Sequence, residues 1–291
     1  MSRTASALTP ALAAALVLAS APARAAWDLN LPPPVTPLAA QILDLHNLIL
    51  WICVVIFIGV FGVMFYSTYA HRKSRGYRAA QFSHNTRLEI LWSVIPAVIL
   101  VVMAVPSTVT LIEMEDTTRS DLSVKITGYQ WFWEYEYMDS GYSFYSRLST
   151  PREQIENRAA KGEHYLLEVD NELVLPVGKK VRFVLTANDV IHAWWVPKLG
   201  IKKDAIPGYV SEMWAVIEKE GVYRGQCAEL CGKDHGFMPI VVRAVSAAEF
   251  EAWLGERAAS AAGAAETVTE TVTIHPGAAV SDVDSTVTVG G

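Results

Sequence analysis

The most regular feature of the sequence is a pair of long apolar runs that no charged residue interrupts. The first extends from Leu48 to Tyr66 and the second from Ile90 to Leu111. Each has the length that a helix needs to cross the hydrocarbon core of a bilayer, about 20 residues. Pro96 and Pro106 lie within the second run, where neighbouring helices and water can satisfy the carbonyl groups that proline leaves free. The pattern predicts a transmembrane helical hairpin, with helices over about residues 45–70 and 89–111.

Charged residues are distributed unequally around this hairpin. The loop between the two runs is basic, whereas the segments outside them are acidic. The basic residues are Arg72, Lys73, Arg75, Arg78 and Arg87, and the acidic ones are Asp28, Asp44, Glu113, Glu115 and Asp116. Because short basic loops remain in the cytoplasm, the hairpin loop is expected to be cytoplasmic and both ends of the chain to lie outside.

The first 25 residues have the pattern of a secretory signal peptide. Arg3 precedes a short apolar stretch, Pro22 ends that stretch, and Ala23-Arg24-Ala25 provides a small-x-small cleavage pattern. A third membrane helix is the alternative, but the stretch is short and rich in alanine. The signal peptide agrees with the charge pattern, since it also places the following residues outside.

Beyond about residue 121 the apolar pattern changes to short alternating and β-branched segments. They are Leu122–Tyr129, Trp131–Tyr137, Tyr165–Val169, Lys180–Thr186, Met213–Ile217 and Phe237–Val245. Turn-forming residues separate them, and such spacing predicts an antiparallel sandwich or barrel. Ser246 is expected to cap a short helix that ends near Trp253 or Leu254. The predicted organisation is a signal peptide over 1–25, an outer segment and hairpin over 26–112, a β domain over 113–257, and a disordered or processed tail over 258–291.

Composition narrows the classes of function. Hydrophobic residues make up 52% of the 291-residue chain, which fits a membrane protein. The formal net charge of -6 argues against nucleic acid as a partner. The three cysteines, Cys53, Cys227 and Cys231, do not form a disulfide framework, and Cys53 lies inside the first apolar run.

The candidate chemistry is concentrated between Gly225 and Pro239. This segment contains Cys227, Cys231, His235 and Met238 within twelve residues. Thiolate and thioether ligands are soft and favour copper over hard cations. A second histidine, His192, stands upstream at the start of another apolar, strand-like stretch.

The number of thiols favours two copper ions over one. A mononuclear blue-copper site uses one cysteine, two histidines and a weak axial methionine, so one thiol is in excess here. If both sulfurs bridge two ions, each ion obtains both sulfurs and one histidine. Three alternatives remain: a Cys227–Cys231 disulfide, a tetrahedral zinc site that adds His235 and His192, and Met238 as a packing residue only.

This loop resembles the CuA motif C-x3-C-x3-H-x2-M of cytochrome c oxidase subunit II. The resemblance extends over about residues 28–257 and includes the hairpin and the segments 128–137, 167–171, 189–192 and 203–208. It implies an all-β, cupredoxin-like (Greek-key) barrel after the two-helix hairpin. It also implies a mixed-valence copper pair whose ligands are His192, Cys227, the Glu229 carbonyl, Cys231, His235 and Met238.

Further roles follow from the resemblance alone. It implies that Trp131 is the exposed residue where electrons enter from cytochrome c, and that the Glu229 carboxylate reaches a magnesium ion shared with subunit I. It also implies cytochrome c docking at acids such as Glu136 and Asp170, although surface acids are usually just solvated. Glu89 would lie near the mouth of a proton path, while capping of the second helix is an equally good reading.

The resemblance further implies subunit II of a proton-pumping oxidase in the bacterial inner membrane, with the copper domain and both termini in the periplasm. The chain would take electrons from reduced cytochrome c and pass them to haem in subunit I, where oxygen is reduced; further oxidase subunits and lipid would surround it. The alternatives are a stand-alone, membrane-tethered copper electron carrier, a nitrous oxide reductase, which shares the copper motif, and a quinol oxidase subunit II, which would lack the ligands.

Overall fold

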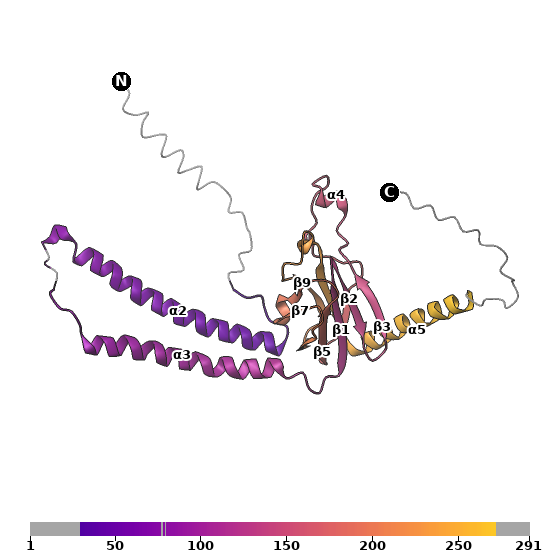
Figure 1. The fold of residues 1–291 in the computed structure, drawn as a ribbon, viewed down its shortest axis with the longest axis horizontal. Coiled ribbons are helices and arrows are strands. Elements are labelled where there is room, and N and C mark those ends of the chain that lie inside the picture. The colour runs from indigo at the N-terminus through magenta and orange to yellow at the C-terminus, as the bar shows by residue number, and fades with distance from the viewer. Residues whose placement is uncertain (1–29, 77, 79, 272–291) are drawn as a thin grey trace, which may run out of the picture. The chain divides into compact units, whose positions relative to one another are not determined.

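The structure is a computed structural model that describes residues 30–76, 78 and 80–271 (Figure 1). The chain divides into two compact units, residues 1–33 and 34–291. Of the first unit only the irregular residues 30–33 are described, so the predicted signal peptide lies outside the described residues. The second unit contains the helical hairpin and the β domain.

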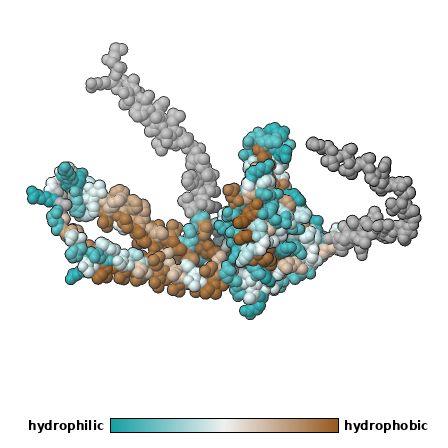
Figure 2. Space-filling view, viewed as in Figure 1, coloured by the Kyte–Doolittle hydropathy of each residue, from teal (hydrophilic) through white to brown (hydrophobic). Residues whose placement is uncertain are grey.

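The hairpin consists of α2 (Pro37–Ala70) and α3 (Thr86–Glu115), and a short turn η1 (Lys73–Arg75) follows α2. Both helices are long and apolar enough to cross a membrane, and Figure 2 shows hydrophobic residues along much of the hairpin. They confirm the predicted pair but extend further than the apolar runs. α2 begins eight residues earlier than predicted because Pro37 occupies its first turn and the Thr36 hydroxyl accepts a hydrogen bond from the Ala39 N–H at 2.9 Å.

The β domain contains two five-stranded sheets. Their orders are β3-β2-β1-β5-β8 and β4-β10-β9-β6-β7. The strands are β1 (Leu122–Tyr129), β2 (Phe132–Tyr137), β3 (Tyr142–Ser146), β4 (Leu173–Pro176), β5 (Lys180–Ala187), β6 (His192–Val196), β7 (Ile201–Ala205), β8 (Ser211–Val216), β9 (Gly221–Cys227) and β10 (Pro239–Val245). Short helical segments are α4 (Arg152–Ile155), η2 (Pro197–Leu199) and η3 (His235–Phe237), and the C-terminal helix is α5 (Ala247–Thr271).

Both sheets contribute to one hydrophobic core. In β2 and β5 every second side chain is buried, as expected for strands with one face in the core. Trp133 and Phe183 from one sheet, and Trp194 from the other, are completely buried in the same cluster. This two-sheet arrangement confirms the predicted cupredoxin-like barrel.

Three sequence-based expectations about the β domain are wrong in detail. The sheets are not wholly antiparallel, because β1 pairs with β5 and β4 with β10 in parallel. Long connections across the barrel make these pairings geometrically accessible. The predicted strand Tyr165–Val169 is irregular: its first two residues lie in a turn, and only Val169 forms a bridge, to Leu148. The strands β3, β4, β7 and β9 were not predicted: β3, β4 and β7 have only five, four and five residues, too few for a clear alternation, whereas β9 has seven.

The C-terminal helix is longer than its sequence pattern predicts. α5 continues to Thr271, so the predicted end near Leu254 is wrong, and so is disorder over residues 258–271. The segment has no core pattern, but it is rich in alanine, the strongest helix former. The rest of the predicted tail, 272–291, lies outside the described residues.

The hairpin joins the β domain through its outer ends. The Thr36 hydroxyl donates to the Leu199 carbonyl at 2.8 Å, and the Trp214 indole N–H donates to the Glu113 carbonyl at 3.0 Å. Gly200, with φ +70, packs so closely against α2 that a Cβ there would lie 2.7 Å from Ala39 Cα. β6, which begins with His192, leads directly through η2 into this junction.

Candidate metal centre

Strand pairing brings the predicted ligands to one end of the barrel. Cys227 is the last residue of β9 and Met238 immediately precedes β10, so the β9–β10 ladder holds both ends of the intervening loop. β9 also pairs with β6, where Trp194 lies opposite Cys227. This second pairing places His192, at the start of β6, beside the loop although it is 35 residues away in sequence.

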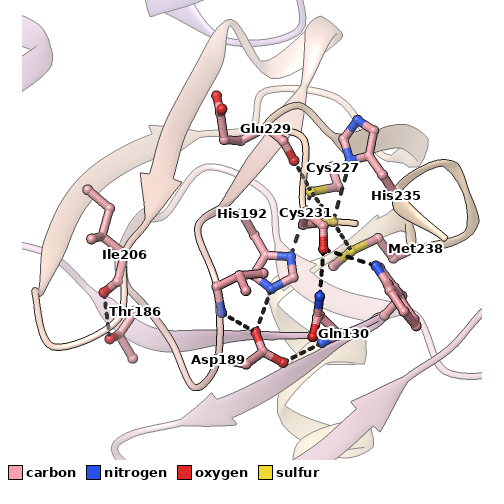
Figure 3. A network of polar contacts seen from close by, with 12 residues as sticks. Gln130, Thr186, Asp189, His192, Ile206, Cys227, Glu229, Cys231, His235 and Met238 are labelled. Atoms are coloured by element: carbon pink, nitrogen blue, oxygen red, sulfur yellow. Dashed lines mark hydrogen bonds and ion pairs between the residues drawn. The ribbon is translucent and has the colours of Figure 1, made fainter. Parts of the chain in front are cut away.

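The sulfur and nitrogen atoms form a continuous cluster (Figure 3). The two sulfurs, Cys227 Sγ and Cys231 Sγ, lie 3.8 Å apart and are not bonded. His192 Nδ1 lies 3.9 Å from Cys227 Sγ, and His235 Nδ1 lies 3.5 Å from Cys231 Sγ. Met238 Sδ is 3.5 Å from Cys231 Sγ. All five side chains proposed from the sequence therefore meet in one place.

Glu229 takes part through its backbone. Its carbonyl oxygen lies 3.4 Å from Cys227 Sγ. Figure 3 shows the carboxylate pointing away from the sulfur atoms. The residue is exposed, so its side chain is free to meet something outside this cluster.

The cluster is buried and closely packed. His192 is completely buried, and Cys227, Cys231 and Met238 are nearly so. The Trp133 ring packs edge-on against the His192 ring with centroids 5.8 Å apart. Such a dry, rigid pocket limits both access of water and movement of the ligands.

The turn between β1 and β2 is hydrogen bonded to this loop. The Gln130 side-chain amide donates to the Cys231 carbonyl at 2.8 Å, and the Trp131 indole N–H donates to the same carbonyl at 3.3 Å. Trp131 is half-buried, not fully exposed as the resemblance implied. The indole is thus in direct polar contact with Cys231, one of the ligands that the sequence predicts.

Asp189 connects the same turn to His192. One of its carboxylate oxygens lies 2.9 Å from His192 Nε2, and the other accepts a hydrogen bond from the Gln130 backbone N–H at 2.7 Å. Sequence reasoning assigned no role to Asp189 or Gln130. The Asp-x-x-His spacing was a signal for the first, but nothing local indicated the second.

Burial and mutual contact shift the pKa values of these groups in opposite directions. Burial raises the pKa of the Cys231 thiol, and the neighbouring Cys227 adds to the increase. Burial also tends to raise the pKa of Cys227, but contact with His192 and backbone N–H groups outweighs it and lowers that pKa. Burial tends to lower the pKa of His192, yet hydrogen bonds with Cys227 and Asp189 raise it overall. Metal binding to the thiolate forms would therefore release protons.

Three other predicted residues lie elsewhere and already have partners within the chain. Glu89, in the first turn of α3, accepts a hydrogen bond from the Asn85 N–H at 3.2 Å. Glu136 forms an ion pair with Lys125 at 3.0 Å. The Asp170 carboxylate accepts hydrogen bonds from the Arg147 and Asn171 N–H groups at 2.7 and 2.8 Å.

The donor set fits a soft metal ion. In the part of the chain that the structure describes, His192, Cys227 and Cys231 have ligand atoms within 4.8 Å of one another. Thiolate, imidazole and thioether together match the preferences of copper.

Comparisons with known proteins identify the family. The family profile described as cytochrome c oxidase subunit II, periplasmic domain, matches residues 122–245, and the one described as its transmembrane domain matches residues 24–109. The probable cytochrome c oxidase subunit 2 of Rickettsia conorii is 40% identical over 232 residues, 79% of this chain and 72% of the relative. The cytochrome c oxidase subunit 2 of Cereibacter sphaeroides is 39% identical over 235 residues, 76% and 78% of the two chains.

A solved structure is also similar. The crystal structure of the periplasmic domain of subunit II of cytochrome oxidase of Bradyrhizobium japonicum shares 44% sequence identity, with a TM-score of 0.43, over 48% of this chain and 94% of that one. The two family profiles together span most of the chain and include both the hairpin and the β domain. The chain therefore belongs to the cytochrome c oxidase subunit II family.

Proposed function

We propose that this chain is the electron-accepting subunit of a respiratory cytochrome c oxidase. It binds a dinuclear copper centre through His192, Cys227, the Glu229 carbonyl, Cys231, His235 and Met238. When bound, the copper pair supplies one-electron redox chemistry. The chain accepts electrons from reduced cytochrome c and passes them to haem in subunit I, where oxygen is reduced and protons are pumped.

The position of His235 is the observation that carries the dinuclear proposal. A single tetrahedral zinc ion, with bonds of about 2.0–2.3 Å, needs all four ligand atoms close to one another. His192, Cys227 and Cys231 satisfy this condition, but His235 lies outside that group and approaches Cys231 instead. A pair of ions held by the two cysteines would give each histidine its own metal and would leave Met238 a role as a weak ligand.

Trp131 is suited to pass electrons to this centre. Its indole N–H is hydrogen bonded to the carbonyl of a ligand residue, Cys231, which provides a short chemical connection. Lys233 lies over the indole ring at 5.9 Å. Asp170, whose partners are neutral N–H groups, adds negative charge for a basic donor, and Glu136 adds less because Lys125 offsets its charge; long-range fields of this kind raise association rates. Because both carboxylates have partners within the chain, their contribution is a field and not a direct contact.

Two acids have proposed roles at other boundaries. The exposed Glu229 carboxylate points away from the sulfurs, which supports a role in holding a magnesium ion together with subunit I. Glu89 would assist proton uptake at the loop end of the hairpin, although its contact with Asn85 also explains it as a helix cap.

The hairpin anchors the copper domain to the membrane. Because the loop between α2 and α3 is basic, we expect it to lie in the cytoplasm. The copper domain would then lie on the periplasmic side of a bacterial inner membrane. A two-helix hairpin cannot house the haem and oxygen chemistry, so a haem-bearing membrane partner is part of the proposal.

Metal analysis of the full chain in detergent tests the proposal. We expect two coppers per chain in the wild type and loss of copper in Cys227→Ser. Cys53→Ser is the matched control, since Cys53 is exposed in the hairpin and its loss should leave two coppers bound. One copper per chain, or zinc in its place, would contradict the dinuclear site.

A further inference from the structure

We propose that Asp189 is a positioning residue that makes the two halves of the copper centre electronically unequal. This inference rests on the proposed function, because it concerns the same site. Asp189 is not a ligand; it acts through His192.

The geometry of His192 assigns one role to each ring nitrogen. Nδ1 faces Cys227 Sγ and is the nitrogen available to a metal. Nε2 lies 2.9 Å from an Asp189 carboxylate oxygen. It therefore carries the ring proton and donates a hydrogen bond to this oxygen. A carboxylate behind a ligand histidine fixes the tautomer and ring orientation and makes the ligand more basic.

Asp189 is itself held in place. The oxygen that faces His192 also accepts a hydrogen bond from the Val190 N–H at 2.7 Å. The second oxygen accepts from the Gln130 N–H at 2.7 Å. The side chain is 27% exposed, whereas that of His192 is 0% exposed. The carboxylate is thus anchored on both sides and only partly screened by water.

His235 has no equivalent support. Within the described residues no carboxylate lies within 4.0 Å of its ring nitrogens, as an ion pair would require. Its ring is half-buried and contacts Cys231 through Nδ1. The two histidine ligands therefore differ in charge environment, in burial and in the rigidity of their surroundings.

This asymmetry has a definite sign. A more basic histidine and a nearby negative charge stabilise the more positive, oxidised form of a metal centre. The half of the pair bound to His192 should therefore carry more of the positive charge, and the reduction potential should be lower than it would be without Asp189.

Asp189→Asn in the full chain, loaded with copper in detergent, tests the inference. An amide has one acceptor oxygen and no negative charge, so it cannot serve both His192 and Gln130. We expect two coppers still bound at saturating copper, and a redox equilibrium shifted toward the reduced form by about tenfold, equal to about 59 mV for one electron. Asp139→Asn is the control: it removes the same charge from an exposed turn between β2 and β3 and should leave the potential unchanged.

A second pair of measurements does not depend on the folding of Asp189→Asn. In wild-type protein, pulsed paramagnetic resonance should resolve two unequal histidine-nitrogen couplings, and Asp189→Glu, which keeps the charge, should have a potential close to the wild-type value. Equal nitrogen couplings, or the same potential in Asp189→Asn and Asp139→Asn, would overturn the inference while leaving the copper site intact. A wild-type chain that binds no copper would instead refute the proposed function.

Discussion

Replacing Gly128 by alanine should displace His192 and weaken metal binding. Gly128 lies in β1 and is held on both sides, by Trp133 of β2 and Ala187 of β5. A Cβ atom at this position would lie 2.8 Å from His192 Cδ2 and 3.0 Å from Cγ. Since ordinary contacts begin at 3.4 Å, the ring must move by about 0.6 Å, the difference between 3.4 and 2.8 Å.

This displacement can be compared with what a metal site tolerates. Metal–ligand distances are maintained to within about 0.2 Å, so a shift of this size distorts the site or separates His192 from Asp189. We expect copper affinity to fall by about tenfold or more, which is about 1.4 kcal/mol. Overpacking of this kind should also lower the free energy of unfolding of the metal-free protein by roughly 1–3 kcal/mol.

Copper affinity is measured by competition with a coloured chelator, and stability by denaturant unfolding of the metal-free chain. Gly236→Ala is the control, because Gly236 lies beside the ligand His235 but has open space around its Cβ position. If Gly128→Ala binds copper as tightly as the wild type, or if Gly236→Ala weakens binding equally, the close packing of β1 against His192 does not determine the site.

Three further predictions concern the junction, the acid response and electron transfer. Gly200→Ala should destabilise the junction between the hairpin and the β domain by roughly 1–3 kcal/mol, because φ is +70 and the new Cβ would meet Ala39. Proteolysis between the hairpin and the β domain should become faster, and an unchanged rate of proteolysis would count against this prediction. A hydrogen bond from Arg182 lowers the pKa of Glu212, so the Glu212 carboxylate stabilises the fold at neutral pH and loses this contribution as pH falls below about 4.3. In denaturation measured at several pH values, the free energy of unfolding of Glu212→Gln should fall less on acidification than that of the wild type, and an equal fall would refute the role of the pair. Trp131→Phe removes the N–H that donates to the backbone carbonyl of Cys231 and should slow reduction by cytochrome c in stopped-flow traces with copper content unchanged. An unaltered rate would remove Trp131 from the path.

The membrane hairpin illustrates how much an apolar pattern can predict. An uncharged run of about 20 residues has few alternatives to a helix in a bilayer, because every backbone polar group must be satisfied within the segment. The ends of the helices were less predictable. Thr36 and Pro37 begin α2 well before the apolar run. Besides capping the helix, the Thr36 hydroxyl donates to the Leu199 carbonyl of η2, a contact that the apolar pattern could not indicate.

The ligands show a similar division. Cys227, Cys231, His235 and Met238 are close in sequence, and one loop between two strands suffices to bring them together, so their chemistry could be inferred directly. Asp189 lies only three positions before His192, so its spacing was a local signal. Gln130 could not be assigned in this way, because its partners Asp189 and Cys231 are distant in sequence. Gln130 approaches Cys231 across 101 positions of sequence.

The sequence by itself determined the elements and the chemistry whose causes are local: two membrane helices, alternating strands and a soft ligand set. Only the tertiary structure decided that β6 pairs with β9 and so places His192 at the loop, that β1 and β5 run parallel, and that Asp189 supports one histidine. The physical reason is that periodicity reports which face of a strand is buried, whereas the choice of neighbouring strand depends on packing summed over the whole core. The second-sphere contacts of the metal centre follow from that choice.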